Sequence, residues 1–303
     1  MARQITAEII ESYRTKLVYE EKSMLTIKKY IRDIGKLKSY AEIYHKNHHD
    51  PGSYDQGNVK NSGQLTKEVL IAFKDKLYNE DHYKIESVNS ILEAVNRFFE
   101  YMEWYELRVK PYRVQMESFT PEERHMSMEE YKRLLSEAKK RGKKRLYLIM
   151  EVLASTGMRV SEIRYITVAS LRTGIVEVNN KGKIRKVLLT QKMKKQLIKY
   201  TKEQNIEEGM VFRTRNGKAI DRTNIWKEMK TLCEAAGVEK SKVFPHSLRR
   251  LFARSLYKVQ KDLAKIADIL GHSNIETTRR YVRETSKEHQ KVLERLQLVG
   301  GYW

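Results

Sequence analysis

The stretch of residues 243–283 constrains the fold most, because it combines signals for three short helices with the bends that must join them. Pro245 is typical of the first turn of a helix, and apolar residues follow it at helical spacing. Gly271 predicts the end of a second helix, and Ser273 with Glu276 predicts a capping box at the start of a third. Polar side chains stand near the first helix start, in the bend and on the third helix. We therefore expect the stretch to bring these side chains together.

The N-terminal third of the chain has the apolar spacing of a small helical bundle. Two helices are expected within residues 6–45, a third after an N-cap at Thr66 and a fourth after an N-cap at Ser87. Residues 47–64 lack periodicity and predict a loop. Residues 104–124 contain two prolines and no long apolar face, so they predict an extended connector.

The remainder of the chain predicts a domain that mixes helices with a small sheet. It starts with a capping box at Ser127. Two segments rich in β-branched residues, 168–178 and 184–189, flank a turn-forming sequence at 179–183, which predicts an antiparallel hairpin. Further helices are expected over residues 192–203, 224–236, 247–260, 263–270, 275–282 and 286–298.

These patterns divide the chain into two domains of different class. We predict a helical bundle over residues 1–108, a linker over residues 109–125, and an α+β domain with a C-terminal tail over residues 126–303. The fold is therefore expected to be mainly α, with one small antiparallel sheet.

The distribution of charge indicates which domain meets a polyanion. The formal net charge is +21, yet residues 1–125 hold 20 Lys and Arg against 20 Asp and Glu, whereas residues 126–303 hold 40 against 19. A domain this basic is typical of proteins that bind nucleic-acid phosphates. The single cysteine, Cys233, excludes an internal disulfide and a cysteine-cluster zinc site, and no metal or cofactor is expected. No run is apolar enough for a membrane span, so we expect a soluble, cytoplasmic protein without a membrane partner.

Tyr281 is the residue of this stretch with the most demanding chemistry. A phenol has a pKa of about 10, so a tyrosine nucleophile needs a proton acceptor and cations beside it. His246 and Arg249, three residues apart at the start of one predicted helix, point to one site, and His272 lies in the bend before Tyr281. Two arginines can hold the non-bridging oxygens of a phosphodiester in its transition state. Arg249 is one candidate, and Arg159, just after a predicted helix end, is the other.

The predicted hairpin supplies the remaining candidates. Lys181 projects from the turn and is the best candidate for a proton donor to the leaving oxygen. The nearby cations Lys183, Arg185 and Lys186 fit equally well as plain phosphate anchors. Each of these signals is weak by itself, and their order and spacing carry the interpretation.

Four sequence boxes resemble a known family, the tyrosine recombinases or integrases, which include phage integrases, Xer proteins and transposon-encoded recombinases. The boxes read T-G-M-R-V-S-E-I, N-N-K-G-K-I-R-K-V, P-H-S-L-R-R-L-F-A and L-G-H-S-N-I-E-T-T-R-R-Y. They resemble the family's first arginine box, its hairpin lysine, its H-x-x-R box and the box with the second histidine and the nucleophile. Residues 5–105 also resemble the family's core-binding domain, a SAM-like helical bundle. The chain departs from the family at Ser247 and Arg250, where Asp and His are commoner, and in the loop at residues 47–64.

The resemblance implies a role for each matching residue. Arg159 and Arg249 would hold the scissile phosphate, and Lys181 would protonate the leaving 5′ oxygen. His246 and His272 would transfer protons and bind phosphate, while Tyr281 would form a 3′-phosphotyrosyl bond. Glu162 would support the site, although a carboxylate that offsets a helix dipole is an equally good explanation for it. Arg250 joins the three hairpin cations as a candidate for phosphate binding.

The resemblance also implies partners and an activity. It implies a site-specific recombinase or integrase that acts on double-stranded DNA with inverted half-sites, without a metal or cofactor. Four protomers would assemble on DNA and exchange strands through a Holliday junction, for integration or excision of a mobile element at the prokaryotic nucleoid. An accessory DNA-bending protein is a candidate partner. Apart from the resemblance, the leucine spacing in residues 287–303 predicts packing on the same or a neighbouring protomer, and we favour the neighbour.

Two other functions, a topoisomerase and a non-catalytic DNA-binding protein, are alternatives to a recombinase. A type IB topoisomerase would relax supercoils with Arg, Lys and Tyr chemistry, but such enzymes usually carry arginine at the position of His246 and lack this N-terminal domain. A DNA-binding accessory protein without catalytic activity is disfavoured because binding alone does not require a nucleophile.

Overall fold

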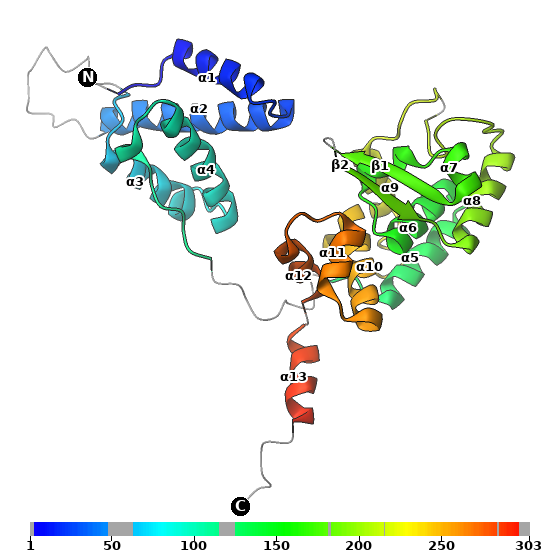
Figure 1. Ribbon diagram of the computed structural model, residues 1–303. Helices are drawn as coiled ribbons and strands as arrows, with labels where there is room; N and C mark the ends of the chain where they lie inside the picture. The colour runs from blue at the N-terminus through cyan, green and yellow to red at the C-terminus, as the bar shows by residue number, and fades with distance from the viewer. Residues whose placement is uncertain are drawn as a thin grey trace, which may run out of the picture. The chain divides into compact units, whose positions relative to one another are not determined.

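The computed structural model describes residues 3–47, 63–114, 125–180, 183–214, 216–283 and 285–296. The chain forms two compact units, Met1–Met116 and Glu117–Trp303. Figure 1 shows the helices of the first unit in blue and cyan and those of the second unit from green to red, with one small sheet in green. The expected class, mainly α with a two-stranded antiparallel sheet, is confirmed. Among the described residues, no helix is long and apolar enough to cross a membrane.

The first unit is a helical bundle around a core rich in aromatic residues. Phe98 and Phe99 are fully buried on α4, and Tyr13 of α1 packs edge-on against Phe98. Thr66 caps α3 as predicted, whereas α4 begins before the predicted Ser87 cap and has no side-chain cap. The elements are α1 (Ala7–Tyr19), α2 (Met24–Asn47), α3 (Lys67–Asp75), the π-helix η2 (Lys76–Glu80), α4 (Ile85–Tyr101) and the 3-10 helix η3 (Tyr105–Leu107).

The segment after α4, at the start of the predicted linker, packs on the bundle. Val109 is only 5% exposed, within the core of the first unit. Asn96 of α4 bonds both backbone groups of Val109, at 2.9 and 3.1 Å, and Asn89 does the same for Tyr112, at 2.8 Å each. Two asparagines two turns apart thus bind an extended segment along α4. The rest of the predicted linker, residues 115–124, lies outside the described residues.

In the second unit, α6 is central and packs against α5, α8, α9 and α10. The sheet pairs β1 with β2, with Val176 opposite Val187 and Val178 opposite Arg185. The elements are α5 (Met128–Lys140), α6 (Lys144–Thr156), the 3-10 helix η5 (Val160–Tyr165), α7 (Val168–Thr173), β1 (Ile175–Asn180), β2 (Lys183–Leu188), α8 (Gln191–Glu203), α9 (Arg222–Lys230), the 3-10 helix η6 (Lys240–Lys242), α10 (Pro245–Gln260), α11 (Leu263–Leu270), α12 (Ile275–Val282) and α13 (Ser286–Arg295).

Several local predictions for this unit are corrected by its capping contacts. Residues 168–173 were expected to be strand, but Thr167 caps a short helix there and Gly174, with φ 78°, ends it. The cap of α12 is Asn274, which accepts from the amide of Glu276 at 2.8 Å, and not Ser273. A local hydrogen bond that starts a helix outweighs the strand preference of β-branched residues.

Candidate active site

Arg249 lies at the centre of the candidate site and is almost fully buried. Its Nη1 donates to the carbonyl of Gly157 at 2.5 Å, and its Nη2 donates to the carbonyl of Leu270 at 2.7 Å. These carbonyls lie at the C-terminal ends of α6 and α11, where helix dipoles favour a cation. Burial, with a further contribution from the charge of Arg159, lowers the pKa of Arg249 to about 10. The guanidinium therefore stays charged at neutral pH.

Gly157 is required for this arrangement. Its φ of 64° is left-handed, and an added Cβ would come within 2.4 Å of the Phe252 ring and 2.7 Å of Leu270. A larger residue would push α10 and α11 away from the end of α6. The glycine thus lets the Gly157 carbonyl reach Arg249.

The hydrogen bonds of His272 determine its tautomer. Arg249 Nη2 donates to His272 Nε2 at 2.9 Å, so Nε2 must be unprotonated. The proton is then on Nδ1, which donates to Thr278 Oγ1 at 2.8 Å. Burial, followed by the charges of Arg249 and Arg159, lowers the pKa of His272 to about 4 and keeps the ring neutral. Thr278 is fully buried on α12 and was missed by the sequence prediction, although its position one turn before Tyr281 places both on one face.

Tyr281 lies within hydrogen-bonding distance of a histidine base. Its hydroxyl is 2.5 Å from His246 Nε2, and the two rings meet edge-on with centroids 5.2 Å apart. His246 is partly exposed, yet desolvation and the charges of Arg250, Arg249 and Arg159 lower its pKa to about 4. A neutral imidazole can accept the phenol proton at Nε2. The guanidinium of Arg250 also lies 5.8 Å from the Tyr281 ring centroid.

Glu162 joins two arginines at the edge of the site. The carboxylate is fully buried and accepts from the amide and the Nη1 of Arg159 at 2.8 and 2.9 Å, and from Arg185 Nη2 at 2.5 Å. Burial opposes ionisation of Glu162, but the Arg159 amide and both guanidinium groups outweigh it, so the pKa of Glu162 is lowered. Glu162 thus caps the start of η5 and also holds Arg159.

The hairpin cations differ in their surroundings. Arg185 was predicted as a phosphate anchor, but its Nη1 donates to the Ile269 carbonyl at 2.8 Å and its Nη2 bonds Glu162, so both ends are engaged within the protein. Lys186 is exposed on β2, with its Nζ 3.8 Å from Glu177. Lys181 lies outside the described residues, and so does the side chain of Lys183. Among the residues that the structure does describe, no group of three or more His, Cys, Asp or Glu side chains could hold a metal ion.

Five of the six predicted catalytic residues therefore meet in one site. The charge of Arg159 lowers the pKa of both histidines and of Arg249, so its guanidinium lies within electrostatic range of all three. The assembly presents a phenol, a neutral base and two guanidinium groups. Such a set suits the transfer of a phosphoryl group to tyrosine.

Comparison with known proteins agrees with this chemistry. The model of the phage integrase family matches residues 124–288, which is more than half of the chain. The tyrosine recombinase XerA of Pyrococcus furiosus is 25% identical over 310 residues, which cover 99% of this chain and 99% of the relative. The tyrosine recombinase XerD of Oceanobacillus iheyensis is 35% identical over 147 residues, which cover 45% of this chain and 49% of the relative.

Solved structures show the same fold. The XerH site-specific recombinase bound to its palindromic difH substrate has a TM-score of 0.72 at 19% identity, over 94% of this chain and 83% of that one. A lambda integrase (75–356) dimer bound to a COC′ core site has a TM-score of 0.68 at 16% identity, over 93% and 96% of the two chains. Together with the family match, these findings show that the chain belongs to the phage integrase family and is a tyrosine recombinase, an enzyme that cleaves and rejoins DNA at specific sites.

Proposed function

We propose that Tyr281 is the nucleophile of this recombinase and that His246 accepts its proton. The observation that carries the proposal is the 2.5 Å contact between the Tyr281 hydroxyl and Nε2 of His246, whose lowered pKa keeps the ring neutral. As the proton moves to His246, the phenolic oxygen attacks the scissile phosphorus and forms a 3′-phosphotyrosyl bond. The bond from phosphorus to the 5′ oxygen breaks, and Lys181 supplies the proton that this oxygen takes.

Arg249 has donors left for the phosphate. Of its five N–H groups, two on Nη2 and one on Nη1 are used within the protein. The buried Nε has no partner in the described part of the chain, and one Nη1 hydrogen also remains. Since an unpaired buried donor is unfavourable, the site fits an incoming phosphate oxygen. Arg159 would hold the other non-bridging oxygen, with Glu162 and Arg185 as positioning residues and Lys183, Lys186 and Arg250 as phosphate contacts.

The same proposal extends to the assembly. We infer that four protomers act on DNA with inverted half-sites and exchange strands through a Holliday junction, in the prokaryotic cytoplasm and for integration or excision of a mobile element. A lambda integrase tetramer bound to a Holliday junction shares the fold, with a TM-score of 0.66. The match to the phage integrase family disfavours the type IB topoisomerase alternative. A helical DNA-binding domain before residue 109 and an accessory DNA-bending protein remain parts of this proposal.

A trapped covalent intermediate tests the proposal. Nicked suicide duplexes, built from the DNA that flanks the gene, should become covalently attached to the wild-type protein, and Tyr281→Phe should abolish the adduct while it leaves DNA binding unchanged. Tyr257→Phe is a matched control, because Tyr257 packs in the same small core cluster and makes no contact with His246. An adduct that survives in Tyr281→Phe would assign the nucleophile to another residue.

A further inference from the structure

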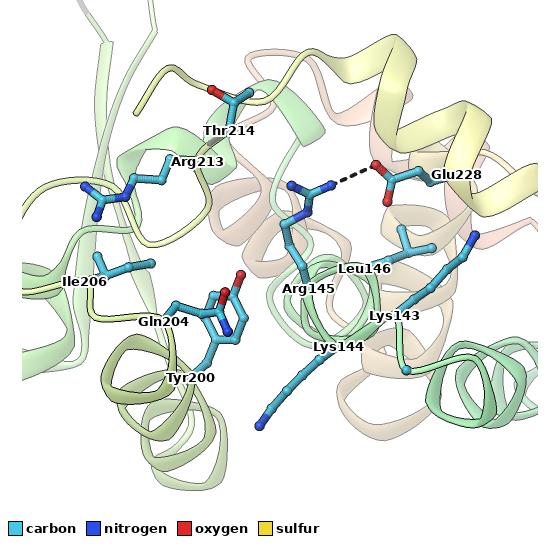
Figure 2. Close-up of a pocket in the computed structure, with 11 residues that line it drawn as sticks. Lys143, Lys144, Arg145, Leu146, Tyr200, Gln204, Ile206, Arg213, Thr214 and Glu228 are labelled. Carbon is cyan, nitrogen blue, oxygen red and sulfur yellow. Dashed lines mark hydrogen bonds and ion pairs between the residues drawn. The ribbon is translucent and has the colours of Figure 1, made fainter. Parts of the chain in front are cut away.

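A cationic pocket of about 590 Å³ lies in the second unit, beside the N-terminus of α6 and the C-terminal end of α8. Figure 2 shows Arg145 and Leu146 on one side of it, and Arg213, Gln204 and Ile206 on the other. Its lining has one carboxylate and four cationic side chains, which are Lys143, Lys144, Arg145 and Arg213. Three of these, Lys143, Lys144 and Arg145, come from the N-cap and first turn of α6, and none of the four belongs to the candidate active site.

Carboxylates neutralise only part of this charge. Arg145 donates to Glu228 at 2.9 Å, and Lys144 pairs with Glu203. Lys143 donates to a neutral group, the Thr231 hydroxyl, at 2.8 Å. Arg213 forms no ion pair with any residue that the structure describes. The pocket therefore keeps an excess of positive charge.

Tyr200 points independently to a ligand. The residue is 6% exposed, and its hydroxyl has no hydrogen-bond partner among the described residues. Figure 2 shows this hydroxyl directed toward the space between Arg145 and Arg213. Burial raises the pKa of Tyr200, with Arg145 acting in the opposite direction, so the hydroxyl remains a donor at neutral pH. The ring is buried while the hydroxyl faces the pocket without an acceptor from the described part of the chain, so an anion that enters the pocket could accept its hydrogen bond.

The start of α6 adds further donors. The helix has 13 residues and no side-chain cap at its N-terminus, where Lys143 and Lys144 line the pocket. The amides of a first helical turn lack partners within the helix, and the helix dipole favours an anion at this end. The Arg145 side chain, the first turn of α6 and the Tyr200 hydroxyl thus border one space, whereas the ammonium groups of Lys143 and Lys144 extend away to Thr231 and Glu203.

We propose that this pocket binds a phosphate group, at a site separate from Tyr281. The source that the geometry favours is the backbone of the bound DNA, and this assignment rests on the proposed function. The far end of α6 carries the Gly157 carbonyl that binds Arg249 at 2.5 Å. A helix of 13 residues spans about 20 Å, which matches about six steps of about 3.4 Å along a DNA strand. One duplex can therefore offer phosphates to both ends of α6.

Two variants test the pocket, one through the salt dependence of DNA affinity and the other through the affinity itself. Arg213→Gln removes the unpaired charge, so the slope of log affinity against log salt should become shallower by about 0.9, as for one lost phosphate contact. Tyr200→Phe removes a neutral donor, so affinity should fall about two- to tenfold with no change of slope. Both are measured on the full chain with a short duplex of arbitrary sequence, since phosphate contacts do not depend on sequence. Lys202→Gln and Tyr131→Phe, from the same unit and outside the pocket, are matched controls that should behave as wild type.

Titration with inorganic phosphate, followed by calorimetry, separates the two sources. If phosphate binds wild type more tightly than Arg213→Gln while all variants bind DNA alike, the pocket takes a free phosphate compound and the assignment to DNA is wrong. If neither measurement distinguishes the pocket variants from their controls, the proposal is overturned.

The thermal stability of Tyr200→Phe should match wild type, because the variant deletes a hydroxyl without a described partner. A large loss of stability would show that the hydroxyl has a structural role and would also overturn the proposal. All variants retain Tyr281, so a missing covalent adduct in wild type would refute the proposed function and leave the phosphate titration interpretable.

Discussion

Arg249 connects elements that are far apart in the sequence, since its guanidinium bonds the ends of α6 and α11 and the ring of His272. Burial of the two site histidines is the main reason for their lowered pKa values, and the charge of Arg249 contributes to both. Single hydrogen bonds at the site therefore determine the tautomer of a histidine and are expected to affect the rate of tyrosine attack.

Thr278→Val should slow formation of the phosphotyrosyl adduct about two- to tenfold. The substitution removes the acceptor of His272 Nδ1, so the ring is no longer held in the tautomer that accepts from Arg249. Single-turnover kinetics on a suicide duplex measure the rate, and ¹⁵N spectra of the imidazole report the tautomer. Thr278→Ser keeps the hydroxyl and should retain both. Equal rates in the Val and Ser variants would show that the hydroxyl does not position His272.

The two site histidines should make stability depend on pH on the acid side. Their pKa values are lowered from 6.5 to about 4 in the folded protein. Between these values the unfolded state binds more protons, so the free energy of unfolding should decrease as pH falls from about 6.5 to about 4 and should not depend on these groups above that range. Urea denaturation across this range measures the effect. A double variant, His246→Asn with His272→Asn, should show a weaker dependence, and an unchanged slope would contradict the assignment.

At the scale of elements, local capping contacts decide several outcomes that apolar patterns leave open. Thr167 and Gly174 make a helix of residues expected to be strand, and Asn274 rather than Ser273 caps α12. The segment around Val109 follows α4 because Asn96 binds its backbone. The spacing of apolar residues does not reveal such pairings, since the partners are polar side chains that do not contribute to that spacing.

The C-terminal helix α13 lacks a packed face in the described structure. It has no buried residue, and Leu293 and Leu296 are each 53% exposed, while Glu288 at its start pairs with Arg254 at 2.6 Å. We expect Leu293→Ser with Leu296→Ser to weaken assembly of protomers on DNA, because these exposed apolar side chains would be buried against a neighbouring protomer. The monomer should keep its thermal stability. Analytical ultracentrifugation with DNA measures assembly. Lys291→Ser, on the same helix, is the control, and unchanged assembly in the double variant would refute a role in protomer contacts.

At the scale of the whole molecule, the two parts of the chain differ in net charge, and the basic part is the one expected to bind DNA phosphates. All of the excess charge lies in residues 126–303, with 40 Lys and Arg against 19 Asp and Glu. If six or more phosphates are neutralised, affinity for duplex DNA should fall at least about 10³-fold between about 50 and 200 mM salt. Fluorescence anisotropy with the full chain measures this, and an affinity almost independent of salt would contradict the phosphate contacts proposed for this domain.

The sequence by itself determined the family, the mainly helical class and the identity of the residues that meet at Tyr281. It could do so because the boxes have a characteristic order, and because Pro245 and Gly271 mark helix ends through their own backbone restrictions. Only the tertiary structure decided the tautomer of His272, the internal bonding of Arg185, the role of Thr278 and the cationic pocket beside Tyr200. Each of these depends on distances between groups from different elements and on burial, and a linear pattern carries neither.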